Sequence, residues 1–259
     1  MDWGLKNRLS RIIKPETGRT VMLAVDHGYF LGPTSGLEVI ADTVQPLLQH
    51  ADSLMLTRGA LRTSVPPDFD IPIVLRVSGG TSILHEDLSN EDITTSMDEA
   101  IKLNASAVAI SIFVGSAHEK ETLTNLARLV TEGEACGIPV LAVTAVGREM
   151  TRDKKYLSLC CRIAAELGAH FVKTYYCDDF AEVVGTCPVP IVIAGGKKIS
   201  EKDALKLAHN AISNGAVGVD MGRNIFQSDH PVGMIKAVRA IVHENVKVEE
   251  AYKLYRKSG

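Results

Sequence analysis

At residues 107–114 the chain reads Ala-Val-Ala-Ile-Ser-Ile-Phe-Val, a run that is apolar at nearly every position. A strand with one wet face would alternate apolar and polar residues, so this continuous run indicates a strand buried on both faces. Such strands are typical of a parallel sheet covered by helices. Together with similar runs it predicts eight strands: Thr20–Val25, Ser53–Leu56, Ile71–Val77, Ala107–Phe113, Val140–Thr144, Phe171–Tyr175, Ile191–Ala194 and Gly218–Met221.

The segments between these strands have the spacing of amphipathic helices. In residues 123–130, apolar side chains recur at i, i+3, i+4 and i+7, which places them on one helical face. The same spacing predicts a helix from Tyr156 to a stop at Gly168, and another from a capping Ser200 to Gly215. Repeated strand–helix–strand order predicts a single-domain α/β protein over all 259 residues, a (β/α)8 TIM barrel, with an open doubly wound sheet as the alternative.

Two parts of the chain depart from this regular repeat. The segment between the second and third strands is short and contains Pro66-Pro67, so it can hold only a stunted helix. Residues 6–14 precede the first strand and fit an extra helix that closes the bottom of the barrel.

The composition is that of an ordinary globular protein. Hydrophobic residues make up 46% and charged residues 23%, and the formal net charge is −3, which disfavours a protein whose main partner is nucleic acid. No apolar run approaches the ~20 residues that span a bilayer, and the N-terminus lacks the apolar core of a signal peptide. The 5 cysteines include no Cys-x-x-Cys pair and are typical of reduced thiols. We therefore expect a cytoplasmic protein with no membrane partner.

Polar residues and glycines follow nearly every predicted strand, at the carboxyl ends where the loops of a barrel converge on its axis. These ends read Asp26-His27-Gly28, Thr57-Arg58-Gly59, Ser78-Gly79-Gly80, Gly115-Ser116, Gly147-Arg148, Lys173-Thr174-Tyr175-Tyr176, Gly195-Gly196-Lys197 and Gly222-Arg223-Asn224. Loops are commonly polar and rich in glycine, but this does not explain a lysine and an aspartate that directly adjoin apolar runs.

Lys173 lies inside a strand that is expected to be buried. Burial of an ammonium group costs free energy, so the lysine must either pair with a carboxylate or lose its proton. A neutral amine in a dry site is the nucleophile that forms a Schiff base with a carbonyl carbon. The alternative is a structural lysine that pairs with an acid near the strand end.

Asp26 and His27 end the first strand. A carboxylate at this place can hold substrate hydroxyl groups or move protons, and an imidazole can carry a proton near neutral pH. The alternatives are that Asp26 only orients its loop or pairs with Lys173, and that His27 is a satisfied structural histidine.

The ends of the last two strands predict a phosphate site. Glycines such as Gly195, Gly196 and Gly222 let backbone N–H groups approach an anion, and the loops after the seventh and eighth strands are the usual phosphate site of a barrel. Arg223 can add a charge-assisted contact. Histidines and cysteines have no ligand spacing, so no metal is expected. Dinucleotide-binding loops and nucleophile elbows are also missing.

In combination, these motifs resemble the archaeal-type class I aldolase family. The resemblance covers nearly the whole chain and rests on Val-Asp26-His27-Gly28, Val-Lys173-Thr174-Tyr175, Ala-Gly195-Gly196, Gly222-Arg223-Asn224-Ile-Phe226-Gln227, Asp2-Trp3-Gly4, Thr57-Arg58-Gly59 and Gln227-Ser228-Asp229-His230-Pro231. It implies that Lys173 is the Schiff-base lysine, that Asp26 is the active-site aspartate, and that Gly195, Gly196, Gly222 and Arg223 bind phosphate. Arg58 is expected to be a further substrate-binding residue. The resemblance also implies a homo-oligomer, based on pentamers and extending to decamers.

One departure separates the branches of this family. Its aldolases, and the related heptulosonate synthases, resemble each other in a Tyr-Pro-Arg-Gly stretch whose tyrosine is the acid/base, but here that place reads Thr144-Ala145-Val146-Gly147-Arg148. The resemblance is closer to the thiolase branch, which acts in autoinducer-2 breakdown. It implies an acyltransferase that cleaves a phosphorylated diketone with coenzyme A, through a Schiff base, to dihydroxyacetone phosphate and acetyl-CoA.

Other readings of the same residues remain open. The first alternative is a class I aldolase that acts on fructose 1,6-bisphosphate or a related sugar phosphate, with Tyr175, Tyr176 or His27 in place of the missing tyrosine. A non-catalytic phosphosugar sensor is the second, which the costly Lys173 disfavours. Coenzyme A is expected as a co-substrate and not as a bound cofactor. Its candidate contacts, Arg152, Lys154 and Lys155, are more typical of a solvated face.

Overall fold

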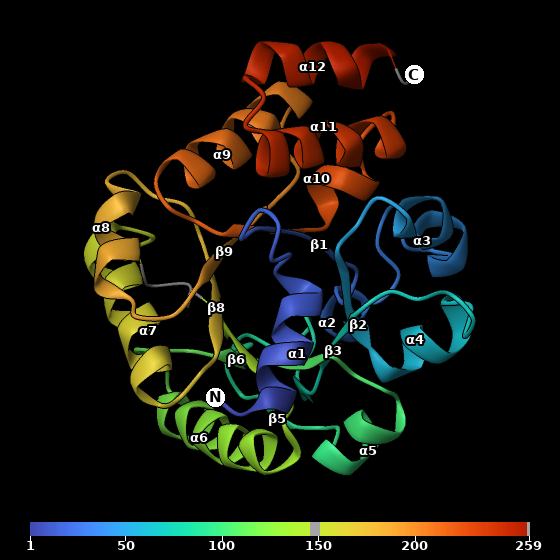
Figure 1. Ribbon diagram of the computed structural model, residues 1–259. Coiled ribbons are helices and arrows are strands. Elements are labelled where there is room, and N and C mark those ends of the chain that lie inside the picture. The colour runs from blue at the N-terminus through green and yellow to red at the C-terminus, as the bar shows by residue number, and fades with distance from the viewer. Residues whose placement is uncertain (146–150, 258–259) are drawn as a thin grey trace.

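The computed structural model describes residues 1–145 and 151–257 (Figure 1). Its eight long parallel strands form a closed barrel in the order β1-β10-β9-β8-β7-β6-β3-β2, which confirms the predicted (β/α)8 barrel over the open sheet. The barrel strands are β1 (Thr20–Ala24), β2 (Ser53–Thr57), β3 (Ile73–Arg76), β6 (Ala107–Ile112), β7 (Val140–Thr144), β8 (Phe171–Thr174), β9 (Ile191–Ala194) and β10 (Gly218–Met221).

The predicted strand ends agree with the observed ones to within two residues. The largest difference is at β3, which begins at Ile73 and not at Ile71. Pro72 lies between these positions and has no N–H group to donate to a neighbouring strand, so the regular ladder starts after it.

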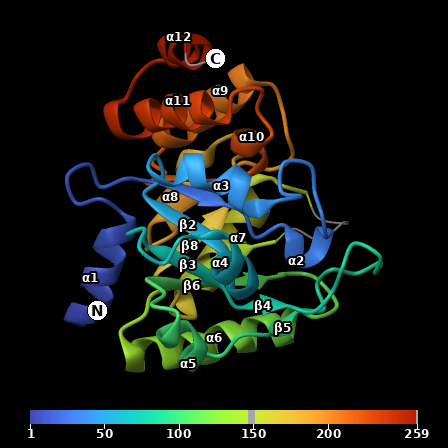
Figure 2. The ribbon, with the colours of Figure 1, turned by 90° about the vertical axis from the view of Figure 1, so that its right-hand side faces the viewer.

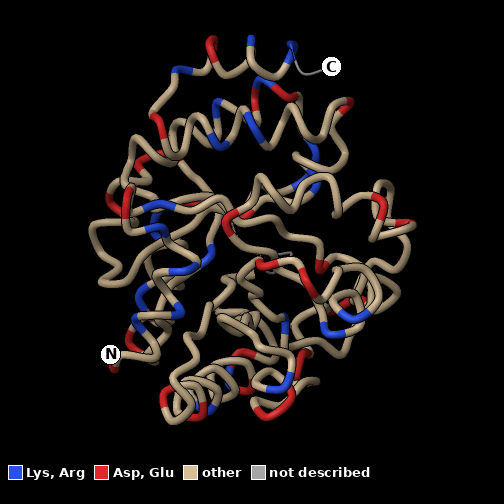
Figure 3. The backbone as a smooth tube through the Cα atoms, turned by 45° about the vertical axis from the view of Figure 1, so that its right-hand side comes forward, with Lys and Arg blue, Asp and Glu red and all other residues tan. Residues whose placement is uncertain are grey.

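The helices surround the barrel (Figure 1). They are α3 (Ile40–Leu48), α4 (Arg58–Ser64), α5 (Met97–Lys102), α6 (Glu119–Cys136), α7 (Lys154–Glu166), α8 (Phe180–Thr186), α9 (Glu201–Ser213), α11 (Pro231–Glu244) and α12 (Val248–Lys257). As the proline pair predicted, α4 is stunted, with 7 residues. Helices α7 and α9 confirm the predicted helices near residues 156–168 and 200–215. Charged residues of both signs are spread over this outer layer (Figure 3).

The two ends of the barrel differ. The predicted extra helix is α1 (Trp3–Ile12), whose Ile12 packs into the barrel interior with Met22, Met55 and Phe171. At the opposite end lie the short α2 (Gly28–Leu31) and a small antiparallel sheet formed by β4 (Ser78–Gly79) and β5 (Asp92–Ile93) (Figure 2). A further short helix, α10 (Arg223–Phe226), follows β10. In the described part of the chain, no helix combines the length and apolarity that crossing a bilayer requires.

Alternation along the strands decides which side chains face the barrel axis. Phe171 belongs to the interior cluster, whereas Val172 belongs to the cluster between barrel and helices. Because successive residues of a strand point to opposite faces, Lys173 points inward again, one layer above Phe171. The α1 end of the barrel is therefore filled by apolar side chains, and the carboxyl end receives the charged ones.

Candidate active site

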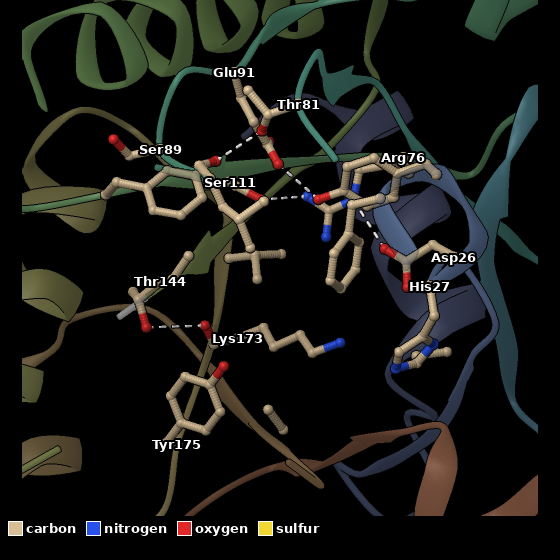
Figure 4. Close-up of a pocket in the computed structure, with 18 of the residues that line it drawn as sticks. Asp26, His27, Arg76, Thr81, Ser89, Glu91, Ser111, Thr144, Lys173 and Tyr175 are labelled. Atoms are coloured by element: carbon tan, nitrogen blue, oxygen red, sulfur yellow. Dashed lines mark hydrogen bonds and ion pairs between the residues drawn. The ribbon is translucent and has the colours of Figure 1, made fainter. Parts of the chain in front are cut away.

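A cavity of about 550 Å³ lies at the carboxyl end of the barrel (Figure 4). This volume is in the range of small-molecule sites. Most of the predicted site residues line it: Asp26, His27, Lys173, Tyr175, Gly195, Gly196, Gly222 and Arg223. Residues far apart in the sequence thus meet at the place where a barrel carries its chemistry.

The structure does not bring Arg58 to this cavity. Arg58 is exposed and begins α4, and the Thr57 hydroxyl at the preceding position accepts a hydrogen bond from the Ala60 N–H group. The start of helix α4 therefore explains the Thr57-Arg58-Gly59 motif. Tyr176 also packs elsewhere, with its ring centroid 5.3 Å from that of Phe180. The predicted loop Gly147-Arg148 lies outside the described residues.

Lys173 is buried in the barrel but reaches the cavity. Its Nζ lies 2.8 Å from Oδ2 of Asp220, and the side chains of the two residues are 10% and 0% exposed. In Figure 4 the lysine side chain extends into the cavity towards His27 and Asp26. Pairing with an acid was the structural alternative for this lysine, but a purely structural lysine has no need to line a cavity.

Asp220 was missed in the sequence, although it is a charged residue in an apolar strand just as Lys173 is. Burial raises the pKa of its carboxyl group, although the neighbouring Lys173 acts in the opposite direction. Apart from the ion pair of Oδ2 with Lys173, the carboxylate oxygens have no hydrogen-bond partner among the described residues. A carboxylate in this state is well suited to take a proton from the lysine, because the transfer neutralises two buried charges at once.

Asp26 pairs with Arg76 rather than with Lys173. The Arg76 Nε donates a hydrogen bond to Asp26 Oδ2 at 2.9 Å, and its Nη1 donates to the Ser111 hydroxyl at 2.8 Å. Burial by itself would raise the pKa of Asp26, but Arg76, followed by Lys173 and His27, holds it below its ordinary value. Asp26 therefore presents an ionised carboxylate at neutral pH.

Glu91 extends this network of buried polar groups. It accepts hydrogen bonds from the Tyr29 hydroxyl at 2.7 Å and from the Ser78 hydroxyl at 2.8 Å. The Ser78 oxygen in turn accepts the backbone N–H of Ser111, which also contacts Arg76. The network fixes the residues before and after the β4–β5 loop against the barrel (Figure 4). Arg76 and Glu91 were both missed, although Arg76 is a charged residue inside a predicted strand.

His27 is neutral under ordinary conditions. Burial lowers its pKa to about 4, although Asp26 acts in the opposite direction. Its Nδ1 has no hydrogen-bond partner among the described residues, and its ring meets that of Phe226 edge-on at 5.6 Å between centroids. A neutral imidazole at the cavity wall can accept a proton, which an imidazolium cannot.

The loops after β9 and β10 form the wall expected to bind phosphate. A Cβ atom on Gly222 would lie 2.3 Å from the Ala24 carbonyl oxygen, so only glycine fits there. The buried Asn224 joins the two loops: its Nδ2 donates to the Gly195 carbonyl at 2.6 Å, and its Oδ1 accepts the Ile199 N–H at 2.9 Å. Arg223 is half-buried beside them, and its Nε has no partner among the described residues.

The three candidate contacts for coenzyme A differ in their surroundings. Arg152 lies over the Tyr175 ring, with its guanidinium carbon 3.7 Å from the centroid. Lys154 forms ion pairs with Asp179 at 3.2 Å and Glu182 at 2.9 Å. Lys155 is exposed. Lys154 therefore belongs to a local ion-pair cluster between α7 and α8, as the solvated-face reading predicted.

Comparison with known proteins places this chain in a family. Residues 20–228 match the model of the DeoC/LacD family aldolases. The 3-hydroxy-5-phosphonooxypentane-2,4-dione thiolase of Escherichia coli K12 is 57% identical over 256 residues, which are 98% of this chain and 88% of that protein.

Solved structures show the same relationship. The crystal structure of an archaeal fructose 1,6-bisphosphate aldolase superposes with a TM-score of 0.83 and 26% identity, over 93% of this chain and 99% of that one. Another structure of an archaeal fructose 1,6-bisphosphate aldolase, with the catalytic lysine covalently bound to the carbinolamine intermediate of the substrate, gives a TM-score of 0.81 and 26% identity over 92% of this chain and 99% of that one. The predicted resemblance to class I aldolases is confirmed, and the chain belongs to the DeoC/LacD aldolase family.

Proposed function

We propose that this chain is a thiolase, an acyltransferase that cleaves 3-hydroxy-5-phosphonooxypentane-2,4-dione with coenzyme A to dihydroxyacetone phosphate and acetyl-CoA. The similarity to the Escherichia coli thiolase supports the substrate. The observation that carries the mechanism is the buried Lys173, whose Nζ lies at the cavity wall 2.8 Å from Asp220. By this reading the chain takes part in the breakdown of autoinducer-2.

Binding begins at the phosphate. Gly195, Gly196 and Gly222 offer backbone groups, and Arg223 adds a cation, so the phosphate arm of the substrate lies against β9 and β10. The ketone next to this arm then comes to Lys173. Transfer of the ammonium proton to Asp220 frees the amine, which adds to the carbonyl carbon, and loss of water leaves an iminium ion on Lys173.

Carbon–carbon cleavage follows from the electron-withdrawing iminium. The thiolate of coenzyme A attacks the acetyl carbonyl, and the bond between the acetyl carbon and the hydroxyl-bearing carbon breaks. Its electron pair moves into the iminium to give an enamine, and acetyl-CoA is released. The enamine carbon takes up one proton, and water then hydrolyses the new iminium to dihydroxyacetone phosphate and free Lys173.

Two residues of the first loop are suited to the proton transfers. His27 is neutral because burial lowers its pKa to about 4, so it can accept the thiol proton of coenzyme A and return a proton to the enamine carbon. Asp26 is held as a carboxylate by Arg76 and can accept a hydrogen bond from the substrate hydroxyl. Tyr175 lines the same cavity under Arg152, where it can contact the entering coenzyme A.

The end of β7 favours thiolysis over aldol cleavage. In the stretch that stands where the family's aldolases carry Tyr-Pro-Arg-Gly, the Thr144 hydroxyl donates to the Thr174 hydroxyl at 2.8 Å and thus stays within the strand layer. Retro-aldol cleavage needs a base that removes the substrate's hydroxyl proton, whereas thiolysis leaves that hydroxyl intact. Coenzyme A enters here as a co-substrate from the open mouth of the cavity, near Arg152 and Lys155.

One assay tests the proposed reaction. The protein is incubated with the phosphorylated diketone, with and without coenzyme A, and separately with fructose 1,6-bisphosphate, while dihydroxyacetone phosphate is followed. We expect release only with the diketone and coenzyme A. Cleavage of the bisphosphate would support the aldolase alternative, and no release from either compound would support the phosphosugar sensor.

Variants of the lysine test the mechanism. Lys173→Ala should abolish turnover while phosphate affinity stays nearly intact. Lys173→Arg is the matched control for charge, because arginine keeps a cation beside Asp220 but cannot form a Schiff base. Borohydride reduction with substrate should label residue 173 in the wild-type protein and neither variant. Normal turnover of Lys173→Ala, or a label elsewhere, would overturn the mechanism.

We further propose that the protein works in the cytoplasm as a homo-oligomer built from pentamers, as one ring or as a decamer of two paired rings. Light scattering coupled to size exclusion tests this. A mass of five or ten chains is the expected result, and a monomeric mass would contradict it.

A further inference from the structure

The cavity has two opposite walls that differ in charge. In the barrel order, β9 and β10 lie diametrically across from β3 and β6. One wall, the phosphate wall, consists of Gly195, Gly196, Gly222 and Arg223 after β9 and β10. The other, which we call the hairpin wall, consists of the cavity-lining residues between β4 and β5: Thr81, Glu86, Asp87, Leu88, Ser89 and Glu91. Figure 4 shows Thr81, Ser89 and Glu91 on the side of Lys173 away from Tyr175.

The hairpin wall is an ordered structure held close to the cavity. The Ile83 N–H donates to the Phe30 carbonyl at 3.0 Å, which ties the loop to α2. Within the loop, the Ser89 N–H donates to the Asp87 carboxylate at 2.8 Å, and the Thr81 hydroxyl donates to the Leu88 carbonyl at 3.2 Å. The Asp87 carboxylate is therefore held within the loop, and the side chain of Glu86 is exposed at the rim of the cavity.

The charges of this wall are acidic, and among the described residues the one contact of its carboxyl groups with a basic side chain is that of Asp87 with His118, at 3.9 Å. The wall contributes the carboxyl groups of Glu86, Asp87 and Glu91 to the cavity. Among the described residues, the cavity is lined by one arginine on the β3 side, Arg76, which is buried and already bound to Asp26 and Ser111. No lysine or arginine in the described lining is thus free on this side to pair with a second anionic group.

We infer that the hairpin wall sets the substrate class: the cavity accepts a ligand with a single phosphate and an uncharged far end, and repels one that carries a phosphate at each end. This inference rests on the proposed function, because it assumes that a phosphate binds at the phosphate wall. A chain that extends from there past Lys173 reaches the hairpin wall, where an acetyl group fits and a second phosphate meets carboxylates. A sugar bisphosphate carries such a second phosphate, whereas the proposed diketone does not.

The test compares direct binding of two probes by calorimetry at low salt, dihydroxyacetone phosphate and fructose 1,6-bisphosphate. We expect the wild-type protein to bind the bisphosphate about tenfold or more weakly, a difference of about 1.4 kcal/mol or more. The double variant Glu86→Gln/Asp87→Asn should reduce this difference in affinity between the two probes, the gap, about tenfold. The affinity for dihydroxyacetone phosphate should change much less. High salt should narrow the wild-type gap as well, because it screens exposed charges.

The matched control is Asp92→Asn. It also removes one carboxylate charge, but Asp92 lies in β5 and does not line the cavity. Asparagine keeps the oxygen that accepts from Asn125 in the wild-type protein, so the loop stays anchored and the gap should not change. Glu86 is exposed, and Glu86→Gln alone therefore serves if the double variant does not fold.

The outcomes separate this inference from the proposed function. Equal binding of both probes by the wild-type protein, or a gap that the Glu86 and Asp87 changes leave untouched, would overturn the charge selection and leave the thiolase proposal standing. No binding of dihydroxyacetone phosphate would instead overturn the phosphate wall, and with it both proposals.

Discussion

The Nζ atom of Lys173 lies 2.8 Å from Oδ2 of Asp220, across the strand β9 that separates their own strands. Both side chains point into the barrel, and burial raises the pKa of the Asp220 carboxyl group despite the adjacent lysine. The pair can therefore exist as two ions or, after one proton transfer, as a neutral amine and a neutral acid. The neutral amine of the second form attacks a ketone. Once Asp220 has given its proton to the departing water, its carboxylate is the counter-charge of the iminium cation.

Replacement of the carboxylate tests this relationship. Asp220→Asn keeps the size of the side chain but removes both the proton acceptor and the counter-charge of the iminium ion. We expect kcat to fall by about 10²-fold or more, in the range of a lost general base. The yield of the borohydride-trapped adduct at Lys173 should fall with it. Wild-type turnover together with a wild-type adduct yield would show that Asp220 serves only the packing of the barrel.

The lowered pKa of His27 predicts how the stability of the fold depends on pH. Burial lowers its pKa from 6.5 to about 4, so the folded protein holds this ring neutral at pH values where an unfolded chain binds a proton. The contribution of His27 to the stability of the fold should consequently decrease as the pH falls from above 6.5 towards 4. Ring resonances followed by NMR, and assigned with His27→Asn, should show a midpoint near pH 4. A midpoint near 6.5 would contradict the inference that burial keeps this ring unprotonated down to about pH 4.

The fold was predictable because buried parallel strands have a local signature. Continuous apolar runs marked most of the barrel strands, and a lysine or aspartate in or next to a strand marked Lys173 and Asp26. These residues are visible in a sequence because burial of a charge is costly wherever it occurs. Asp220 and Arg76 carried the same signal, as charged residues inside predicted strands, and were overlooked.

The pairing of these charges was not predictable. Asp26 and Arg76 are 50 positions apart and meet only because β1 and β3 both end at the same rim of a closed barrel. The partner of Lys173 likewise depends on barrel closure, which brings β8 and β10 to either side of β9. Arg58 shows the opposite error, since a polar residue after a strand can simply begin a helix, as the Thr57 cap does here.

Gly222 offers a test of the phosphate wall. A Cβ atom there would lie 2.3 Å from the Ala24 carbonyl and 2.5 Å from His27 Cε1, so Gly222→Ala must displace backbone or the imidazole. We expect a loss of about 1–3 kcal/mol in the free energy of unfolding and at least about tenfold weaker binding of dihydroxyacetone phosphate, by about 1.4 kcal/mol.

The control for this change is a glycine that lies inside a helix. Gly185 lies within α8, and a Cβ atom on it would meet no atom within 4 Å. Gly185→Ala should be neutral or stabilise the fold by up to about 1 kcal/mol. Should Gly222→Ala bind the ligand as the wild type does, close backbone approach at this loop would have no part in phosphate recognition.

The opposite end of the barrel is held by Asp52, which should affect stability without affecting chemistry. Its carboxylate binds Arg239 at 2.8 Å and His243 at 2.7 Å, and thereby ties α11 to the start of β2. Burial opposes its ionisation, but hydrogen bonds from His243 and Arg239 keep the pKa of Asp52 below its ordinary value. The stability that Asp52 contributes is thus present above its unfolded pKa of 3.8 and is lost as the pH falls through its lower folded pKa.

The variant Asp52→Asn tests this contribution. It should lower the free energy of unfolding by about 2–3 kcal/mol in urea at pH 7, less than loss of a fully buried pair, because Arg239 is partly exposed. Asp70→Asn removes an exposed partner of Arg11 and should cost about 0.5 kcal/mol or less. Equal stabilities of the two variants would show that Asp52 does not fasten α11, whereas a larger loss for Asp52→Asn with unchanged turnover would separate the stabilising end of this barrel from its catalytic end.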